Sequence, residues 1–406
     1  MRAIRVFSAA KFRSVAAAVA TFGLGAAGAA YAEKNHPLLP LSAVDSGGSL
    51  AAADDDEDDD DRGGARVTSI AGLNNIQQIG STEKINDANG NAIMVDPDPY
   101  KIAIVPQKLG KLARGTILVS NIGNVLGTTI VKFQPFPSTG VQFNAVTAGL
   151  QGPADLSFNH RHLLVANSKG GNSIQVLNPN GSLFMSITNP LFNNPWGLTT
   201  GFPHSFSPIS TFFVANKSDA KVLRVDVLEG SAGAAPTFKV TQIAQLTVMD
   251  GGATKIDMRW VPILRVGTQF LFDVLVVQDP AQNRIAAIPH ASTLNTSTGA
   301  ATTIFQGKPL NVPGGIAINP FNNDILVANL MDNNLVEINP INASVVAVKT
   351  VDPLKVDAMG NNSALFGVAA TVDKHDNLLV FYTDDNTNTL NALSAAPLTA
   401  TPAERE

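Results

Sequence analysis

The amino-acid sequence predicts an all-β fold made of six repeated units, each of four antiparallel strands. Three observations support this prediction. The stretch LLVAN (163–167) returns as FFVAN (212–216) and ILVAN (325–329). Short apolar runs alternate with turns rich in Asn, Gly and Pro along residues 98–393, and no long window has helical periodicity. Self-similarity at a period of about 50 residues is typical of repeat architectures, in which each unit packs on its neighbours.

Each repeat carries an Asn or Asp, here called the anchor, at the end of its second apolar run. The anchors lie 46 to 63 residues apart and are Asn121, Asn167, Asn216, Asp279, Asn329 and Asp384. A run introduced by a Gly- or Pro-containing turn, such as GPADLSF (152–158), supplies the first strand of each unit. We assign the anchor side chains to hairpin turns, where they bond backbone N–H groups two residues on. A ring of six ligand groups is the alternative.

One four-stranded sheet leaves two bare edges and cannot bury both of its faces, whereas six sheets arranged radially bury their faces against each other. The sequence therefore predicts a six-bladed β-propeller. The sixth unit ends after about three strands, because apolar alternation stops at Ser394. We expect residues 66–72 (RVTSIAG) to supply the missing outer strand, with Val67 and Ile70 as its apolar residues. The longest excursion is expected in the fourth blade, around residues 259–270.

The N-terminal region has the layout of a secretory signal peptide, with a basic start, a small-apolar run and AYA ending at Ala32. A membrane anchor is the alternative, but the apolar run is short for a span. We expect these divisions: signal peptide 1–32, disordered acidic linker 33–65, propeller 66–394 and C-terminal tail 395–406. Export would place the protein in the periplasm or outside the cell, with no transmembrane segment after cleavage. The chain has no Cys, so no disulfide supports the fold.

The run DDDEDDDD (Asp54–Asp61) concentrates the negative charge of the chain, whose net charge is −5. Eight like charges repel each other and have no apolar surface to bury, so a solvated linker is the preferred interpretation. A calcium tether or a tether to a cationic surface is the alternative. Residues 66–406 are nearly neutral and have no basic stripe, which argues against nucleic acid as a partner. We expect a monomer.

The repeats resemble NHL repeats. The stretch GIAINPFNNDILVANLMDNNLVEINP (315–340) follows the NHL pattern of an apolar first strand, a short turn and a second strand, and QNRIAAI (282–288) is similar to its third element. The resemblance covers residues 98–393 and implies a six-bladed propeller. It implies little about activity, because propellers support many functions on one scaffold.

Two enzyme groups share this type of propeller. The gluconolactonase-like (SMP-30) proteins hold a divalent cation at the central channel through a Glu, an Asn and an Asp. This chain has DPDPY (96–100) in place of the Glu entry, while MDGG (249–252) offers Asp250 and NNPWG (193–197) offers Asn194. Such oxygen ligands would favour calcium if a cation is bound. The resemblance to streptogramin lyases is weaker, because none of the six His residues opens a first strand.

The turns into the first strand and after the second strand open on the same face of a four-strand meander. We expect this face to bind a protein, a peptide or a carbohydrate, because it is rich in uncharged polar groups. The candidate ligand-binding residues are Asn194, Trp196, Asp250 and Asn311, and Asp250 and Asn194 are the candidate metal ligands. Trp196 could equally cap a blade interface. The predicted function is a binding scaffold without a cofactor; a calcium-dependent lactonase or lyase is the alternative.

Overall fold

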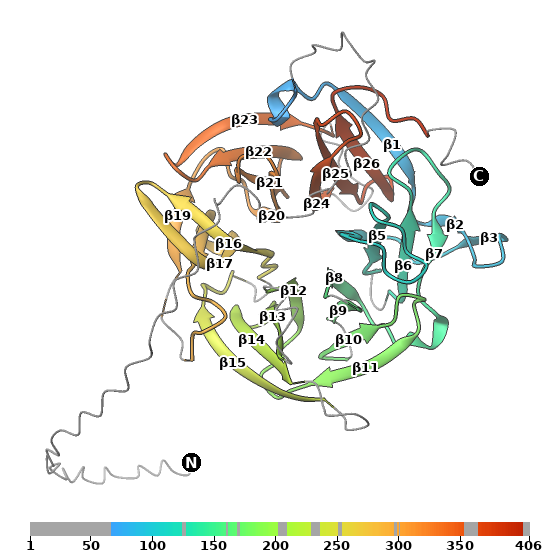
Figure 1. Cartoon of the computed structure of the whole chain (residues 1–406), viewed down its shortest axis with the longest axis horizontal. Coiled ribbons are helices and arrows are strands. Elements are labelled where there is room, and N and C mark those ends of the chain that lie inside the picture. Colours follow the sequence, from blue (N-terminus) through green and yellow to red (C-terminus); the bar gives the residue numbers. More distant parts are fainter. Residues whose placement is uncertain are drawn as a thin grey trace, which may run out of the picture. The chain divides into compact units, whose positions relative to one another are not determined.

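The computed structural model describes residues 66–400 except 124–126, 160, 169–170, 202–208, 229–235, 251–253, 296–298, 300 and 353–363. The predicted signal peptide, the acidic linker and residues 401–406 lie outside the described residues. The described chain forms six sheets arranged in a ring, which confirms the six-bladed propeller (Figure 1). Its helices are three short 3-10 turns: η1 (Ile70–Gly72), η2 (Val146–Ala148) and η3 (Pro280–Gln282). Among the described residues, no helix is long and apolar enough to cross a membrane.

Each blade is an antiparallel meander that runs from a first strand near the centre to a fourth strand at the rim (Figure 1). Blades 1 and 2 contain β4 (Pro99–Ile104), β5 (Ile117–Asn121), β6 (Thr129–Phe133) and β7 (Val141–Gln142), then β8 (Pro153–Phe158), β9 (Leu163–Asn167), β10 (Ser173–Leu177) and β11 (Leu183–Thr188). Blades 3 and 4 contain β12 (Pro195–Thr200), β13 (Ile209–Asn216), β14 (Lys221–Leu228) and β15 (Thr237–Gln245), then β16 (Met258–Val266), β17 (Gln269–Asp279), β18 (Arg284–Ile288) and β19 (Thr302–Gln306). Blades 5 and 6 contain β20 (Pro313–Ile318), β21 (Ile325–Asn329), β22 (Asn334–Asn339) and β23 (Ser344–Thr350), then β24 (Leu365–Val372), β25 (Leu378–Asp384), β26 (Thr389–Ser394) and β1 (Asn75–Ser81).

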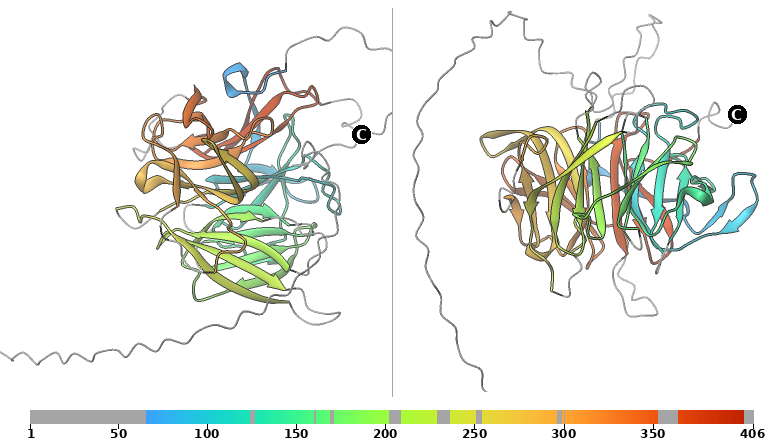
Figure 2. Two further views of the ribbon diagram at one scale, coloured as in Figure 1. Left: turned by 60° about the vertical axis from the view of Figure 1, so that its left-hand side comes forward. Right: turned by 90° about the horizontal axis from the view of Figure 1, so that it is seen from below.

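All six anchors end the second strand of their blade, as predicted. In blade 2, for example, Pro153 at the start of the first strand pairs with the anchor Asn167. We call the face that carries these strand ends the entry face, and the opposite face the exit face. Figure 2 shows the blades edge on, with their strands running between these two faces.

The Asn anchors do not act as predicted, whereas the two Asp anchors accept a backbone N–H group from the following turn, three residues on and not two. Asn121, Asn167, Asn216 and Asn329 donate from Nδ2 to backbone carbonyls of the segment that enters their own blade, such as Leu191 O at 2.8 Å from Asn216 and Pro309 O at 2.8 Å from Asn329. Asp279 pairs with Arg284 and also accepts a backbone bond from Gln282 of the following turn, and Asp384 accepts one from Thr387 N. The Asn anchors therefore hold the blade entry against the end of the second strand. These amide groups need such acceptors, because the Asn anchors are almost completely buried and cannot bond to water.

Blades 1 and 4 depart from the predicted plan. Residues 259–270, expected as an excursion, lie in a long hairpin of β16 and β17, which pair from Met258–Val277 to Val266–Gln269. Blade 1 gains two strands, β2 (Lys84–Asn86) and β3 (Ala92–Met94), of which β2 pairs in parallel with β7. This hairpin lies outside the ring in Figure 1.

An N-terminal strand closes the ring, as predicted, but the predicted segment is wrong. The strand is β1, and it pairs with β26 from Asn75–Ser394 to Ser81–Thr389. Residues 66–72 do not form a strand, because the Ser69 side chain accepts a bond from Ala71 N and starts the 3-10 turn η1. The Ser at position 69 thus favours a local turn over strand pairing.

Residues 66–73 instead form a strap across blades 5 and 6. Val67 N donates to Asn377 Oδ1 at 2.9 Å and Val67 O accepts from Leu378 N at 2.7 Å, which attaches the strap to blade 6. Ile70 N donates to the buried carboxylate of Glu337 in blade 5 at 2.9 Å. The Ile70 side chain is fully buried in the core between the two blades, whereas Val67 is partly buried.

An apolar cluster fills each of the six interfaces between adjacent blades. The second strands ILVSN, LLVAN and ILVAN are buried along their whole length, which explains why this apolar pattern recurs. The cluster between blades 6 and 1 includes Ile79 of β1 together with Phe133 and Phe381. The clasp strand therefore contributes both backbone pairing and core packing to ring closure.

We predict that Ile79→Ala lowers the free energy of unfolding by about 2–5 kcal/mol, because it leaves a cavity at the interface that closes the ring. Ile76→Ala on the same strand is the matched control, since Ile76 is 47% exposed and Ile79 only 2%. That control should change the stability by less than about 0.5 kcal/mol. Urea denaturation measures both; equal losses would contradict a closing role for the buried side chain.

Candidate functional site

Equivalent residues of the six first strands line the propeller axis. The pairing register identifies them. In every blade, the residue that follows the axis residue pairs with the residue two positions before the anchor. The six equivalent residues are Lys101, Asp155, Gly197, Asp257, Gly315 and Gly367. Three of these are charged and three have no side chain, which is an unusual set for strands that are otherwise apolar.

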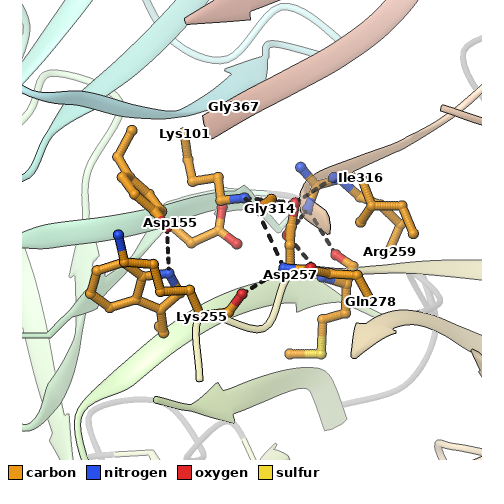
Figure 3. Close-up of polar contacts among 12 residues, drawn as sticks. Lys101, Asp155, Lys255, Asp257, Arg259, Gln278, Gly314, Ile316 and Gly367 are labelled. Atoms are coloured by element: carbon orange, nitrogen blue, oxygen red, sulfur yellow. Dashed lines mark hydrogen bonds and ion pairs between the residues drawn. The ribbon is translucent and has the colours of Figure 1, made fainter. Parts of the chain in front are cut away.

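Lys101 reaches across the axis to the opposite blade. Its Nζ lies 2.8 Å from Oδ2 of Asp257 and donates to Gly314 O at 3.0 Å (Figure 3). Both side chains of the ion pair are fully buried. A buried charge pair is stable only when its remaining hydrogen-bonding capacity is satisfied, so the other contacts of Asp257 matter.

Both oxygens of Asp257 are fully engaged. Oδ2 also accepts from Ile316 N of blade 5 at 2.8 Å, and Oδ1 accepts from Met258 N and from Arg259 NH1, each at 2.8 Å. Burial alone would raise the pKa of Asp257, but Arg259 and Lys101 outweigh it and hold that pKa below its usual value. Asp257 is therefore a carboxylate that two cations neutralise.

Asp155 is the second buried acid at the axis, and its state differs. Its Oδ2 accepts from Leu198 N of blade 3 at 2.8 Å, and its Oδ1 accepts from Leu156 N at 2.7 Å. Burial, reinforced by the nearby Asp257 carboxylate, raises the pKa of Asp155 to about 7. Asp155 and Asp257 have one structural role in common, because each accepts a bond from the inner edge of the next blade's first strand. Such an edge has no further strand to pair with.

The glycines show how closely the first strands approach each other. A Cβ at Gly315 would overlap the carbonyl oxygen of Phe366, and a Cβ at Gly367 would lie 2.5 Å from the carbonyl oxygen of Tyr100. Neighbouring blades therefore touch backbone to backbone at these two positions. The side chains of Lys101, Asp155 and Asp257, the other three axis residues, are fully buried.

An aromatic layer covers the charged layer on the entry side. Tyr100, Trp196 and Phe366 each stand one residue before an axis residue, and Trp196 Nε1 donates to Tyr100 Oη at 3.0 Å. The Tyr100 and Phe366 ring centroids are 4.7 Å apart. Lys217 Nζ lies 4.0 Å from the Trp196 centroid and Lys255 Nζ lies 4.7 Å from the Phe366 centroid, distances at which cation–π attraction operates. We call these five residues the aromatic platform.

The structure brings the predicted ligand-binding residues to the entry face, in different settings. Trp196 is 2% exposed and belongs to the aromatic platform. Asn194 has a left-handed backbone (φ 61°), and its Oδ1 accepts from Ser168 Oγ of blade 2. Asn311 donates to Asp332 Oδ2 at 3.1 Å, and Asp250 is an exposed turn residue between blades 3 and 4. Their binding roles stay predictions.

The axis does not fit a divalent cation. Each oxygen of Asp257 already accepts two donors, one of which is the Lys101 ammonium, and Asp155 carries a proton at pH values below about 7. In the described part of the chain, no group of three or more His, Asp or Glu side chains is arranged to hold a metal ion. Calcium binding by Asp250 and Asn194 at the entry face remains a separate prediction.

Comparisons with known proteins support the propeller fold but do not assign the chain to a family. No protein-family model and no curated protein matches the sequence. The structure is similar to auxiliary nutrient binding proteins from Bacteroides thetaiotaomicron (TM-score 0.51) and Bacteroides ovatus (TM-score 0.50), each at 9% identity over 78% of this chain and 75% of that chain. A gluconolactonase from Xanthomonas campestris gives a TM-score of 0.47 at 10% identity, over 79% of this chain and 98% of that chain. At these identities the likeness shows the propeller fold alone.

Sequence analysis missed the axis residues Lys101, Asp155 and Asp257. A signal for them was present, because each interrupts an apolar first strand: YKIAI, ADLSF and KIDM. Aligning the six first strands would have placed three charges against three glycines. It would not have shown that Lys101 pairs with Asp257 rather than with Asp155.

We predict that Lys101→Met destabilises the protein by about 3–5 kcal/mol, because it leaves the buried Asp257 without one of its cations. The double variant Lys101→Met with Asp257→Asn should lose less than the sum of the single variants, with a coupling of about 0.5–3 kcal/mol. Denaturant titration of the four proteins gives the coupling. Additive losses would mean that the two side chains do not depend on each other.

A pH dependence follows from Asp155. The unfolded carboxyl has its usual pKa of 3.8, whereas the folded one titrates at about 7, so the native state holds a proton that the unfolded state releases. The contribution of Asp155 to stability is therefore full below about pH 4, falls as the pH rises toward 7 and is lost above it. The limiting slope is about 1.4 kcal/mol per pH unit.

Asp155→Asn should remove this slope. Denaturation of both proteins between pH 4 and 8 measures it, and the difference between them cancels the contribution of Asp324, whose pKa burial raises to about 6. Asp250→Asn, which changes an exposed carboxylate, is the control. Parallel pH profiles for the wild type and Asp155→Asn would show that Asp155 does not hold the proton.

Proposed function

We propose that this protein is an exported NHL-type propeller that binds a protein, peptide or carbohydrate ligand on its entry face and carries out no chemistry at its axis. The observation that carries the proposal is the buried Lys101–Asp257 pair, which spans the axis with no exposed surface on either side chain. Lys101 and Arg259 are both bonded to Asp257, and each oxygen of Asp155 accepts a backbone N–H group. The axis is thereby used for stability, which leaves the faces for function.

The aromatic platform supports a binding role at the centre of the entry face. Its three rings are buried, whereas Lys217 and Lys255 above them are half-buried. These two ammonium groups can donate hydrogen bonds to the hydroxyl or carbonyl groups of a sugar or peptide, and the rings below hold them in place by cation–π attraction. Asn194 directly precedes the first strand of blade 3, and Asn311 lies two residues before the first strand of blade 5. Both residues are therefore in turns of the entry face. In binding sites, polar groups such as amides usually fix the orientation of the ligand by hydrogen bonds.

The fold comparison agrees with a binding role without assigning one. Auxiliary nutrient binding proteins share this propeller architecture at low identity, which makes small nutrients and glycans reasonable first probes. Export is proposed from the signal-like N-terminus, and the monomeric state from the closed ring, which leaves no blade interface to complete between chains.

The chain offers a direct binding assay, because it has only two tryptophans, Trp196 and Trp260. In a Trp260→Phe variant, Trp196 is the sole indole and reports on the aromatic platform. We expect one member of a panel of oligosaccharides and short peptides to shift the emission of Trp196 in a saturable manner. Asn311→Ala should weaken that binding roughly five- to tenfold, the worth of about one hydrogen bond.

Asn342→Ala is the matched control, since Asn342 is an exposed amide on the exit face of the same blade. Equal effects of Asn311→Ala and Asn342→Ala would place the ligand elsewhere. The enzymatic alternative has its own test, in which lactone hydrolysis is measured with calcium and with a chelator. Calcium-dependent turnover that Asp250→Asn abolishes would replace the proposed function by a lactonase.

A further inference from the structure

The exit face of blades 6, 1 and 2 presents a group of exposed cations. The turn between β4 and β5 carries Lys108, Lys111 and Arg114, the turn between β8 and β9 carries Arg161, and the turn between β24 and β25 carries Lys374. All five side chains belong to exposed residues. We call them the exit-face basic surface. Blades 6 and 1 are adjacent, because β24 and β25 pack against β4.

The basic turn of blade 1 is well held. Leu109 and Leu112 exchange two backbone hydrogen bonds of 2.9 Å, and the Leu112 side chain is 3% exposed. Gly110 of the same turn packs on Pro179 of blade 2. The cations of this turn therefore belong to an ordered loop. They lose less conformational entropy on binding than cations of a flexible segment would.

Few carboxylates oppose these cations on the same surface. The turns of blades 1 and 2, residues 105–116 and 159–162, contain no acidic residue, and neither do the neighbouring turns 134–140 and 178–182. In blade 6, Asp373 accepts two turn N–H groups and Asp376 pairs with Arg66 at 2.9 Å. The surface is thus strongly positive in a chain whose net charge is −5.

The counter-charge is present in the same chain, close to where the described residues begin. Arg66 lies on the exit face of blade 6, and the acidic run Asp54–Asp61 ends five residues before it. An extended chain spans about 3.3–3.6 Å per residue, so Asp61 can lie roughly 17 Å from Arg66 and Asp54 about 40 Å from it. The run can therefore reach blade 6 and the adjacent blade 1 without any movement of the propeller.

We propose that the acidic run Asp54–Asp61 docks on the exit-face basic surface and shields it from other anionic partners. Eight carboxylates meet five exposed cations, so the contact is electrostatic and weakens with salt. Exposed ion pairs contribute little to stability, so we expect residues 33–65 to add little to the free energy of unfolding. The entry face, where the ligand is proposed to bind, stays uncovered.

Carbodiimide coupling of the full chain followed by mass spectrometry tests the contact directly, because it joins carboxylates to lysines in ion-pair contact. We expect intramolecular links from Asp54–Asp61 to Lys108, Lys111 and Lys374 at low salt, and at least a fivefold loss of these links in about 0.5 M NaCl, where charges are screened within a few ångströms. Links spread evenly over Lys84, Lys239 and the basic surface would overturn the proposal.

A second measurement uses a fluorescent peptide of sequence DDDEDDDD and a full chain whose run is neutralised, with each Asp54–Asp61 acid replaced by its amide. The peptide should bind the neutralised chain at least tenfold more tightly than the wild-type chain. Lys108→Gln with Lys111→Gln should abolish that binding, whereas Lys84→Gln with Lys239→Gln, an equal charge change at exposed sites elsewhere, should not.

Two results would overturn the proposal. Equal peptide binding by the wild-type and neutralised chains would show that the run does not occupy the surface. Binding of the wild-type chain to vesicles of phosphatidylserine and phosphatidylcholine through Lys108 and Lys111 would assign the surface to a membrane instead.

Discussion

Every blade of this protein has to bury both of its faces, and the rest of the structure follows from that constraint. A four-stranded sheet with apolar residues on both sides is stable only between two neighbours, so the array has to close into a ring. Six apolar clusters, one at each interface, are the result. The last interface is completed by β1, which comes from the other end of the described chain, and the strap of residues 66–73 holds blades 5 and 6 beside it.

Closure of a six-membered ring brings the first strands close together at the axis. Backbone contacts at Gly197, Gly315 and Gly367 show that three of these approaches leave no room for a Cβ atom. The inner edges of the first strands still carry N–H groups that need acceptors, and Asp155 and Asp257 supply them. Burial and the neighbouring Asp257 carboxylate raise the pKa of Asp155, whereas Asp257 stays ionised and requires a counter-charge. Lys101 provides it from the opposite blade, and Arg259 adds a second cation.

Filling of the axis has a functional consequence. The charges of Lys101 and Asp257 are bonded to each other and are not available to a substrate. The proposed recognition of ligands therefore falls to the entry and exit faces. The entry face combines lysines and amides above the buried rings of Tyr100, Trp196 and Phe366, whereas the exit face of blades 6, 1 and 2 is basic. One ring can thus present two chemically distinct surfaces, and the propeller fold itself specifies neither.

The sequence by itself determined the repeat: six anchors, the strands that end at them, and the need for a closing strand, because side-chain alternation and turn chemistry are local properties. It placed the closing strand at residues 66–72 instead of Asn75–Ser81, since both segments are strand-like and only the Ser69 cap and the Glu337 contacts separate them. The candidate residues Asn194, Trp196 and Asn311 were found because they stand in entry turns. Only the tertiary structure decided that Lys101 meets Asp257, 156 residues away, and that burial raises the pKa of Asp155. Which equivalent positions face each other across a ring depends on the number of blades and on the depth of burial, and neither is encoded within one repeat.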